Sequence, residues 1–104
     1  QSTMTLLQEE INNKAGDSRQ VAEILTSAQE QIANNMRAGN NFESAYSSAL
    51  TEVADNMQDV QSQIDQIGNY IKDGSQDARL SDLRDRHEAM STARNILQQA
   101  TGEL

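Results

Sequence analysis

The sequence predicts an all-α protein, an antiparallel bundle of three to four helices built on a long coiled-coil-like helical hairpin. Two observations predict this class. The chain of 104 residues contains no proline, the residue that breaks helix interiors, and its large apolar residues recur at spacings of three and four. The hairpin is expected to pair residues 42–72 with about 77–101. We expect residues 1–104 to form one helical-bundle domain, either a whole protein or a segment of a longer chain.

The long helix of this hairpin carries an unbroken apolar stripe, which we call the seam. Successive seam residues lie alternately four and three positions apart, the heptad pattern of a helix that packs against partner helices. The eight seam residues are Tyr46, Leu50, Val53, Met57, Val60, Ile64, Ile67 and Ile71. They are the candidate interaction surface of the protein.

The heptad positions beside the seam are small or neutral. Positions e and g carry no charge, and their residues are Ser47, Ala54, Gln61, Gly68, Ala49, Asn56, Gln63 and Tyr70. A two-stranded parallel coiled coil normally carries Glu and Lys there, so the sequence favours a wider buried face on which two or more helices pack. Gly68 either admits a neighbouring backbone or simply weakens the helix by about 1 kcal/mol.

A short first helix is predicted over about 3–14. Met4, Leu7 and Ile11 share one face, and Gly16 follows where a C-terminal cap belongs. An isolated helix of this length is marginal in water, so we expect it to dock on another helix.

Asp17 or Ser18 is expected to cap the start of a second helix, and Asp17 with Gln20 resembles a capping box. Gly39 ends this helix. Because residues 37–41 are too few for a long excursion, the next helix is expected to double back as an antiparallel neighbour. The apolar face of the second helix consists of Val21, Ile24, Leu25, Ala28, Ile32 and Met36.

The long third helix is expected to start at a capping box made by Asn40 and Glu43. Residues 72–75 form the clearest turn of the chain. The last helix is predicted from 77 or 80 to 101, ending at Gly102. Its apolar stripe contains Leu80, Leu83, His87, Met90, Arg94, Leu97, Thr101 and Leu104.

The charges are unevenly distributed. The long helix carries five acidic residues and no Lys or Arg, whereas the last helix carries most of the arginines. An antiparallel hairpin that turns near residue 75 brings Asp65 near Arg84 and Arg86, and Asp59 near Arg94. Such exposed pairs contribute roughly 0–1 kcal/mol each, so they influence orientation more than stability.

No motif supports catalysis, and we predict that the protein is not an enzyme and binds no metal or cofactor. His87 is the only histidine, and the chain has no cysteine. A general base or pH switch at His87 is one interpretation, but catalysis needs a second converging group. We favour a histidine that packs at the edge of the apolar stripe. The carboxylates of Glu52, Asp55 and Asp59 are best explained as a solvated face.

The net charge of −8 argues against nucleic-acid binding and against adhesion to anionic membranes. No stretch is apolar and long enough to span a bilayer. We therefore expect a protein partner, through self-association or a helical partner, and no membrane insertion by this segment. The first hypothesis is a structural or interaction component of a larger helical assembly. The alternative is a helical binding module, such as an effector, chaperone or sensor domain.

In general character the chain resembles secreted helical components of bacterial export machines, such as translocator, tip or filament proteins of type III secretion. These proteins also tend to be cysteine-free, polar-rich coiled coils, and helical virion proteins of bacteriophages share that character. The resemblance favours a secreted or exported protein, with a cytoplasmic location as the alternative.

Overall fold

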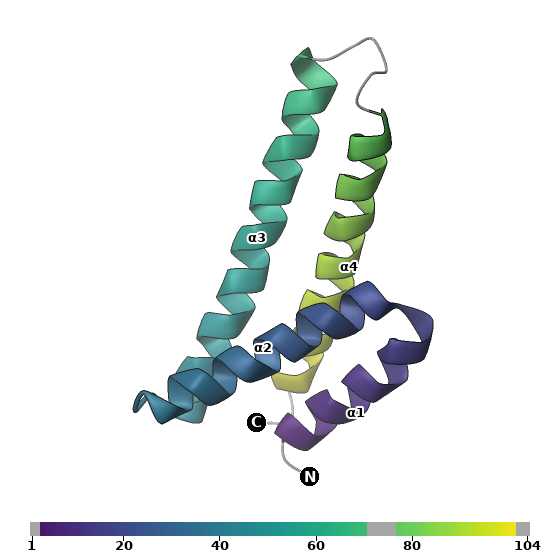
Figure 1. The fold of residues 1–104 in the computed structure, drawn as a ribbon. Coiled ribbons are helices and arrows are strands. Elements are labelled where there is room, and N and C mark those ends of the chain that lie inside the picture. The colour runs from purple at the N-terminus through teal and green to yellow at the C-terminus, as the bar shows by residue number, and fades with distance from the viewer. Residues whose placement is uncertain (1–2, 71–76, 102–104) are drawn as a thin grey trace.

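The computed structural model describes residues 3–70 and 77–101, and these ranges are almost entirely helical. The helices are α1 (Thr3–Asp17), α2 (Arg19–Arg37), α3 (Phe42–Tyr70) and α4 (Asp77–Thr101) (Figure 1). The all-α class and the hairpin of the two longest helices are therefore confirmed. The predicted turn at 72–75, the predicted helix end at Gly102 and the seam residue Ile71 lie outside the described residues.

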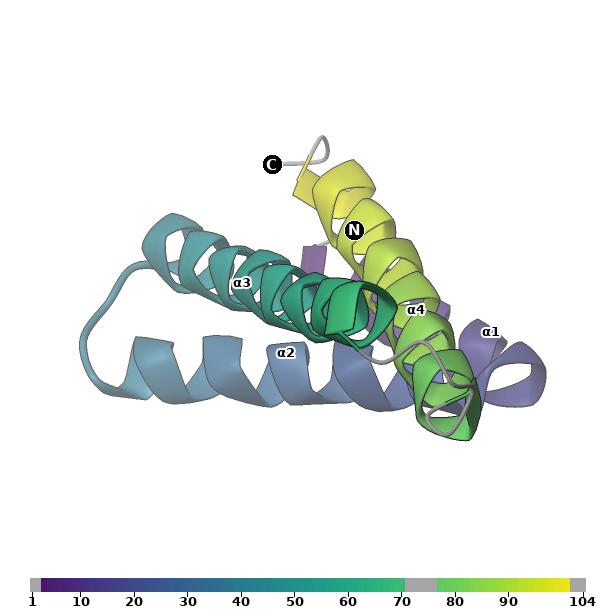
Figure 2. The same cartoon turned by 90° about the horizontal axis from the view of Figure 1, so that it is seen from above.

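The helices form two layers. α3 and α4 run antiparallel as a hairpin and share the largest interface in the molecule. α2 crosses one face of this hairpin obliquely and contacts both of its helices, while α1 packs against α2 and α4. Figure 2 shows α1 and α2 on the same side of the hairpin, and no helix of the described ranges covers the other side. As expected, α3 doubles back beside α2.

A single residue, Ser18, separates α1 from α2. Its backbone is extended, and its hydroxyl accepts a hydrogen bond from the Val21 N–H at 3.3 Å, which makes Ser18 the N-cap of α2. The predicted cap at Gly16 is wrong, because α1 continues through Gly16 to Asp17. The Ser18 N–H still bonds to the Lys14 carbonyl, so the first helix ends only where the second begins. Asp17 is therefore not the cap of α2.

The turn between α2 and α3 is built on Gly39, whose φ of 104° lies in the left-handed region that favours glycine. The Gly39 N–H bonds to the Met36 carbonyl and the Asn40 N–H bonds to the Asn35 carbonyl, the two bonds of a Schellman motif. Because Asn40 still belongs to this motif, the predicted cap at Asn40 is wrong by one residue. Asn41 caps α3 instead, accepting a bond from the Ser44 N–H at 2.8 Å.

The main core lies where α1 and α2 pack on the hairpin. It contains apolar residues from all four helices: Leu7, Ile11, Val21, Leu25, Ala28, Ile32, Ala45, Tyr46, Ala49, Val53, Ala89, Ala93 and Leu97. Met36, expected on the apolar face of α2, is instead 45% exposed. Met36 lies in the last turn of α2, at the edge of the face that the hairpin covers.

Tyr46 ties the two hairpin helices together inside this core. Its side chain is 1% exposed, and its hydroxyl donates a hydrogen bond to the Leu97 carbonyl at 2.7 Å. Burial raises the pKa of Tyr46 to about 12, because the phenolate would lose its hydration. The ring also contacts Phe42, with the ring centroids 5.7 Å apart.

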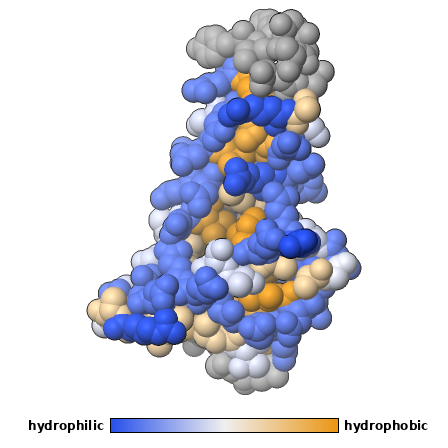
Figure 3. Space-filling model, viewed as in Figure 1, coloured by the Kyte–Doolittle hydropathy of each residue, from blue (hydrophilic) through white to orange (hydrophobic). Residues whose placement is uncertain are grey.

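Beyond the main core, the hairpin continues as a two-helix projection. We call residues 57–70 of α3 and 77–84 of α4 the arm. A small second cluster fills it, with Val60, Ile67 and Leu83 buried and Ile64 and Leu80 partly buried, and Met90 of α4 packs against both this cluster and the main core. Figure 3 shows apolar residues at the surface between the two helices of the arm, beyond α2. The radius of gyration is 15.6 Å, against about 13 Å for a compact domain of this length, because the arm extends the molecule.

Candidate interaction surface

Most of the seam is used within the chain. The heptad d residues Tyr46, Val53, Val60 and Ile67 are buried, as is Met57 at an a position. The other described a residues, Leu50 and Ile64, are only half-buried. The d positions and Met57 therefore face the partner helices of the same chain, and Leu50 and Ile64 turn toward the open side of the hairpin.

The neutral flanks of the seam have two different environments. Ala49 is buried in the main core, where a wide face carries more than one helix, as expected from its small size. Gln61 and Gly68 are exposed, because α4 is the only described helix that packs on α3 in the arm, and Asn56 is exposed beside α2. A Cβ atom added to Gly68 would meet no described atom within 4 Å. Gly68 therefore admits no neighbouring backbone among the described residues.

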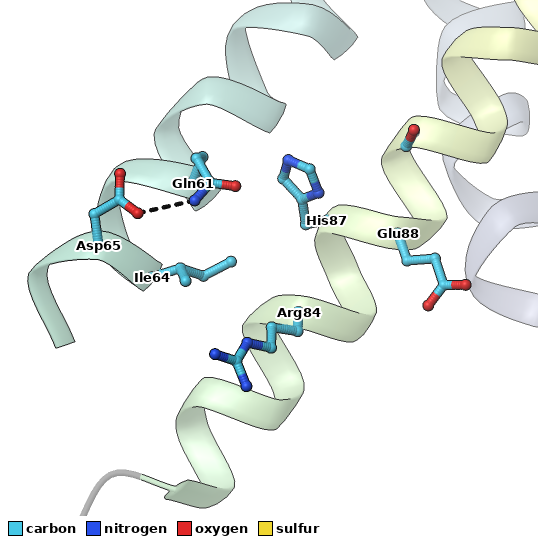
Figure 4. Close-up of a pocket in the computed structure, with 7 residues that line it drawn as sticks. Gln61, Ile64, Asp65, Arg84, His87 and Glu88 are labelled. Atoms are coloured by element: carbon cyan, nitrogen blue, oxygen red, sulfur yellow. Dashed lines mark hydrogen bonds between the residues drawn. The ribbon is translucent and has the colours of Figure 1, made fainter. Parts of the chain in front are cut away.

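An open groove of about 590 Å³ runs between α3 and α4 on the side of the hairpin that no described helix covers. Its walls are Gln61, Ile64, Asp65, Arg84, His87, Glu88 and Ser91 (Figure 4). Glu52 and Asn56 line a different pocket together with α2. Gln61 follows Glu52 by about two and a half helical turns, so the two side chains leave α3 on opposite sides. We call the α3–α4 side that contains the groove the groove face.

The charged residues of the groove face are not paired across the groove. Asp65 and Arg84 line the same groove, as their predicted proximity requires, but no ion pair joins them. Asp65 instead accepts a hydrogen bond from Gln61 at 2.9 Å. The described ranges contain one ion pair within 4 Å, between Arg19 and Glu23, and it is exposed on α2.

The other predicted charge pairs also do not form in the part of the chain that the structure describes. Asp59 makes no ion pair with Arg94, and Asp65 makes none with Arg86. Arg94 is half-buried, and its Nε has no hydrogen-bond partner in the described structure. At the arm, Arg79 donates to the Gln63 side chain at 3.5 Å rather than to a carboxylate. Within the described ranges the arginines of α4 therefore have no acidic partner from α3, and Arg79, Arg84 and Arg86 are exposed.

His87 is half-buried, and its ring extends from α4 into the groove toward α3 (Figure 4). Its groove neighbours are polar and charged residues of both helices, with Ile64 as the apolar one. The position agrees with a histidine at the edge of the apolar stripe. The acidic residues Glu52, Asp55 and Asp59 are exposed, and the described residues contain no group of three His, Cys, Asp or Glu side chains that could hold a metal ion.

Sequence reasoning missed the groove itself, because it depends on which side of the hairpin α1 and α2 occupy. The relevant feature of the sequence is the low charge of the residues that flank the seam. Low charge there is compatible both with a buried face and with an open polar face, so it does not predict the groove. None of the helices over the described ranges combines the length and apolar character needed to cross a membrane. Comparison with known protein families, with curated proteins and with solved structures finds no match for the chain.

Proposed function

We propose that this protein is a non-enzymatic structural or interaction component of a larger helical assembly, and that the hairpin is the part it presents to the assembly. One observation carries the proposal. The seam continues along α3 well beyond the region that α1 and α2 cover, and its half-buried residue Ile64 lines the open groove between the two helices of the arm (Figure 4).

The energetics of the arm support this proposal. Its cluster has three buried residues, whereas the main core has thirteen. A short two-helix unit with little apolar burial gains most of its stability from packing against further elements, because isolated helices are marginal in water. A partner laid on the arm would bury the half-exposed Ile64 and Leu80, each square ångström contributing roughly 25 cal/mol.

The charge of the chain narrows the kind of partner. A net charge of −8 opposes phosphate backbones and anionic membranes, so we propose a protein partner. Exposed Arg79, Arg84 and Arg86 on α4 are positioned to meet acidic groups of such a partner. The general resemblance to exported bacterial helical proteins and to virion proteins makes an exported assembly the setting that we propose.

A photo-crosslinking side chain placed at Gln61, on the groove face, tests this function in the cells that produce the protein. The matched control is the same side chain at Ser48, which is also exposed on α3 but lies in the part that carries the main core. We expect discrete protein adducts from Gln61 and none from Ser48. Equal background from both positions would mean that the groove face meets no partner, and the proposal would fail.

The groove also favours the second candidate, a helical binding module. An open groove of about 590 Å³ with both apolar and hydrogen-bonding walls could receive one segment of a partner protein. A single adduct with one other protein at Gln61 supports the module. A ladder of adducts that increase by the mass of one repeating subunit supports the assembly component.

A further inference from the structure

No helix of the described ranges covers the groove face anywhere along the hairpin, either at the arm or beside the main core. Both covering helices lie on the other side of α3 and α4 (Figure 2). α3 has 29 residues and α4 has 25, so this face is roughly 40 Å long at 1.5 Å per residue. Half-buried Leu50, Ala54 and Ile64 follow the α3 side of this face.

The two helices of this face differ in charge, and within the described ranges no ion pair joins them. α3 carries acidic residues and no Lys or Arg, while α4 carries the four arginines Arg79, Arg84, Arg86 and Arg94 beside the four acidic residues Asp77, Asp82, Asp85 and Glu88. Asp65 and Arg84 lie at the same level of the hairpin, since they line one groove, yet they form no ion pair. Figure 4 shows Arg84 extending from α4 toward α3 and Asp65 on the outer side of α3.

We propose that the groove face binds the same face of a second copy of this chain, about a two-fold axis parallel to the hairpin. This proposal rests on the proposed function and names its partner. The rotation sets α3 of each copy against α4 of the other, antiparallel and at the same level. Asp65 of each copy then lies beside Arg84 of the other, so the contact is self-complementary.

The charges select this axis over the alternative. A two-fold axis across the hairpin would set α3 against α3 of the second copy, which places acidic helices face to face. The axis along the hairpin sets each acidic helix against α4, which has as many basic as acidic residues, and places Asp65 beside Arg84, which electrostatic complementarity favours. The product is a four-helix bundle in which adjacent helices are antiparallel, a common arrangement with short connections.

The available area is sufficient for a dimer. Two neighbouring helices about 9 Å apart present a strip roughly 18 Å wide, so a 40 Å face offers about 700 Å² per copy. Standard protein interfaces bury about 800 Å² per partner. The face is polar for its size, because Gln61, Ser91 and His87 lie along it. We therefore expect a reversible dimer rather than an obligate one.

Charge reversal in two separate chains tests the proposal. The variants are Asp65→Arg and Arg84→Asp, and the matched control is Asp59→Arg, an exposed position of α3 that does not line the groove. Sedimentation equilibrium over a concentration series gives the dissociation constant of each protein, and circular dichroism confirms that each remains helical. Because each dimer contains the pair twice, either single reversal should weaken association roughly 10- to 30-fold.

Mixing the two variants separates contacts between chains from contacts within one chain. In a mixed dimer each reversed residue meets an opposite charge on the other copy, so association should return to the wild-type strength. Native mass spectrometry should show the heterodimer. A contact confined within one chain would not be restored by mixing, but it would be restored in a single chain that carries both changes.

Three results would overturn the proposal: a wild-type protein that stays monomeric over the whole series, an Asp59→Arg control that weakens association as much as Asp65→Arg, or a mixture that fails to recover. The proposed function is tested independently. A monomeric wild type that still gives a discrete adduct from Gln61 with a different protein would end the self-pairing proposal and leave the proposed function standing.

Discussion

Removing one oxygen atom from the core, by Tyr46→Phe, tests how α3 is held to α4. The ring stays and keeps its packing, while the hydrogen bond to the Leu97 carbonyl at 2.7 Å is lost. A buried hydrogen bond contributes about 0.5–1.5 kcal/mol to stability. For a domain of this size, a loss of about 1 kcal/mol lowers the melting temperature by roughly 4–8 °C.

The same hydroxyl gives stability a specific pH dependence. Below pH 10 the tyrosine is protonated in the folded and the unfolded chain, so its ionisation contributes nothing. Above pH 10 the unfolded chain ionises, while the folded chain stays neutral until about pH 12, so stability falls as pH rises through this window. The full difference corresponds to about 2.7 kcal/mol at 1.36 kcal/mol per pKa unit.

Tyr46→Phe removes this loss of folding stability at alkaline pH. The wild type should be the more stable protein at neutral pH, and its advantage should disappear at about pH 10.6 and then reverse. Urea unfolding of both proteins at matched pH measures the difference, and the titration of all other groups cancels.

A direct measurement uses Tyr70→Phe, which leaves Tyr46 as the only tyrosine. The ultraviolet titration of this variant should have its midpoint near pH 12 while the protein is helical. A midpoint near 10, or an unchanged neutral-pH stability in Tyr46→Phe, would refute the buried donor assigned to Tyr46.

Three further substitutions test other parts of the fold. Met57→Asp buries an unpaired carboxylate in the seam and should cost about 3 kcal/mol or more, seen as unfolding or dissociation; retained helicity and size would contradict the burial of Met57. Gly39→Ala should lower stability in urea by about 1–2 kcal/mol, because its φ of 104° strains any side chain, and an unchanged midpoint would argue against this turn. Gly68→Ala meets no atom within 4 Å, so it should raise monomer stability by up to about 1 kcal/mol; a loss of stability in the isolated chain would show that the site is crowded.

The helices could be predicted from sequence because their signals are local. Heptad spacing from Tyr46 onward gives the long helix, and Gly39 gives the end of α2 through its left-handed backbone. The errors at Gly16 and Asn40 have a local cause as well. α1 continues one residue past Gly16, and Asn41 rather than Asn40 caps α3, because neighbouring residues that can each end or begin a helix do not specify which one the chain uses.

The groove face could not be predicted, because it depends on long-range geometry. The seam spacing is the same along all of α3, yet Ala49 on one flank of the seam lies in the main core, whereas Gln61 on the other flank is open to solvent. Only the position of α2 across the hairpin creates this difference, and no residue of α3 records it. The register of the hairpin places Asp65 and Arg84 in one groove, as expected. Asp65 nevertheless accepts a hydrogen bond from the Gln61 amide instead of pairing with Arg84.

The two apolar clusters divide α3 between two cooperative units. One continuous helix begins in a large core shared by all four helices and ends in a small cluster shared with α4 alone. Regions with few buried apolar contacts open at lower free energy than the rest of a protein. We therefore expect the distal hairpin to open sub-globally while the base of the molecule stays native, so that contacts made through it exchange without unfolding of the whole chain.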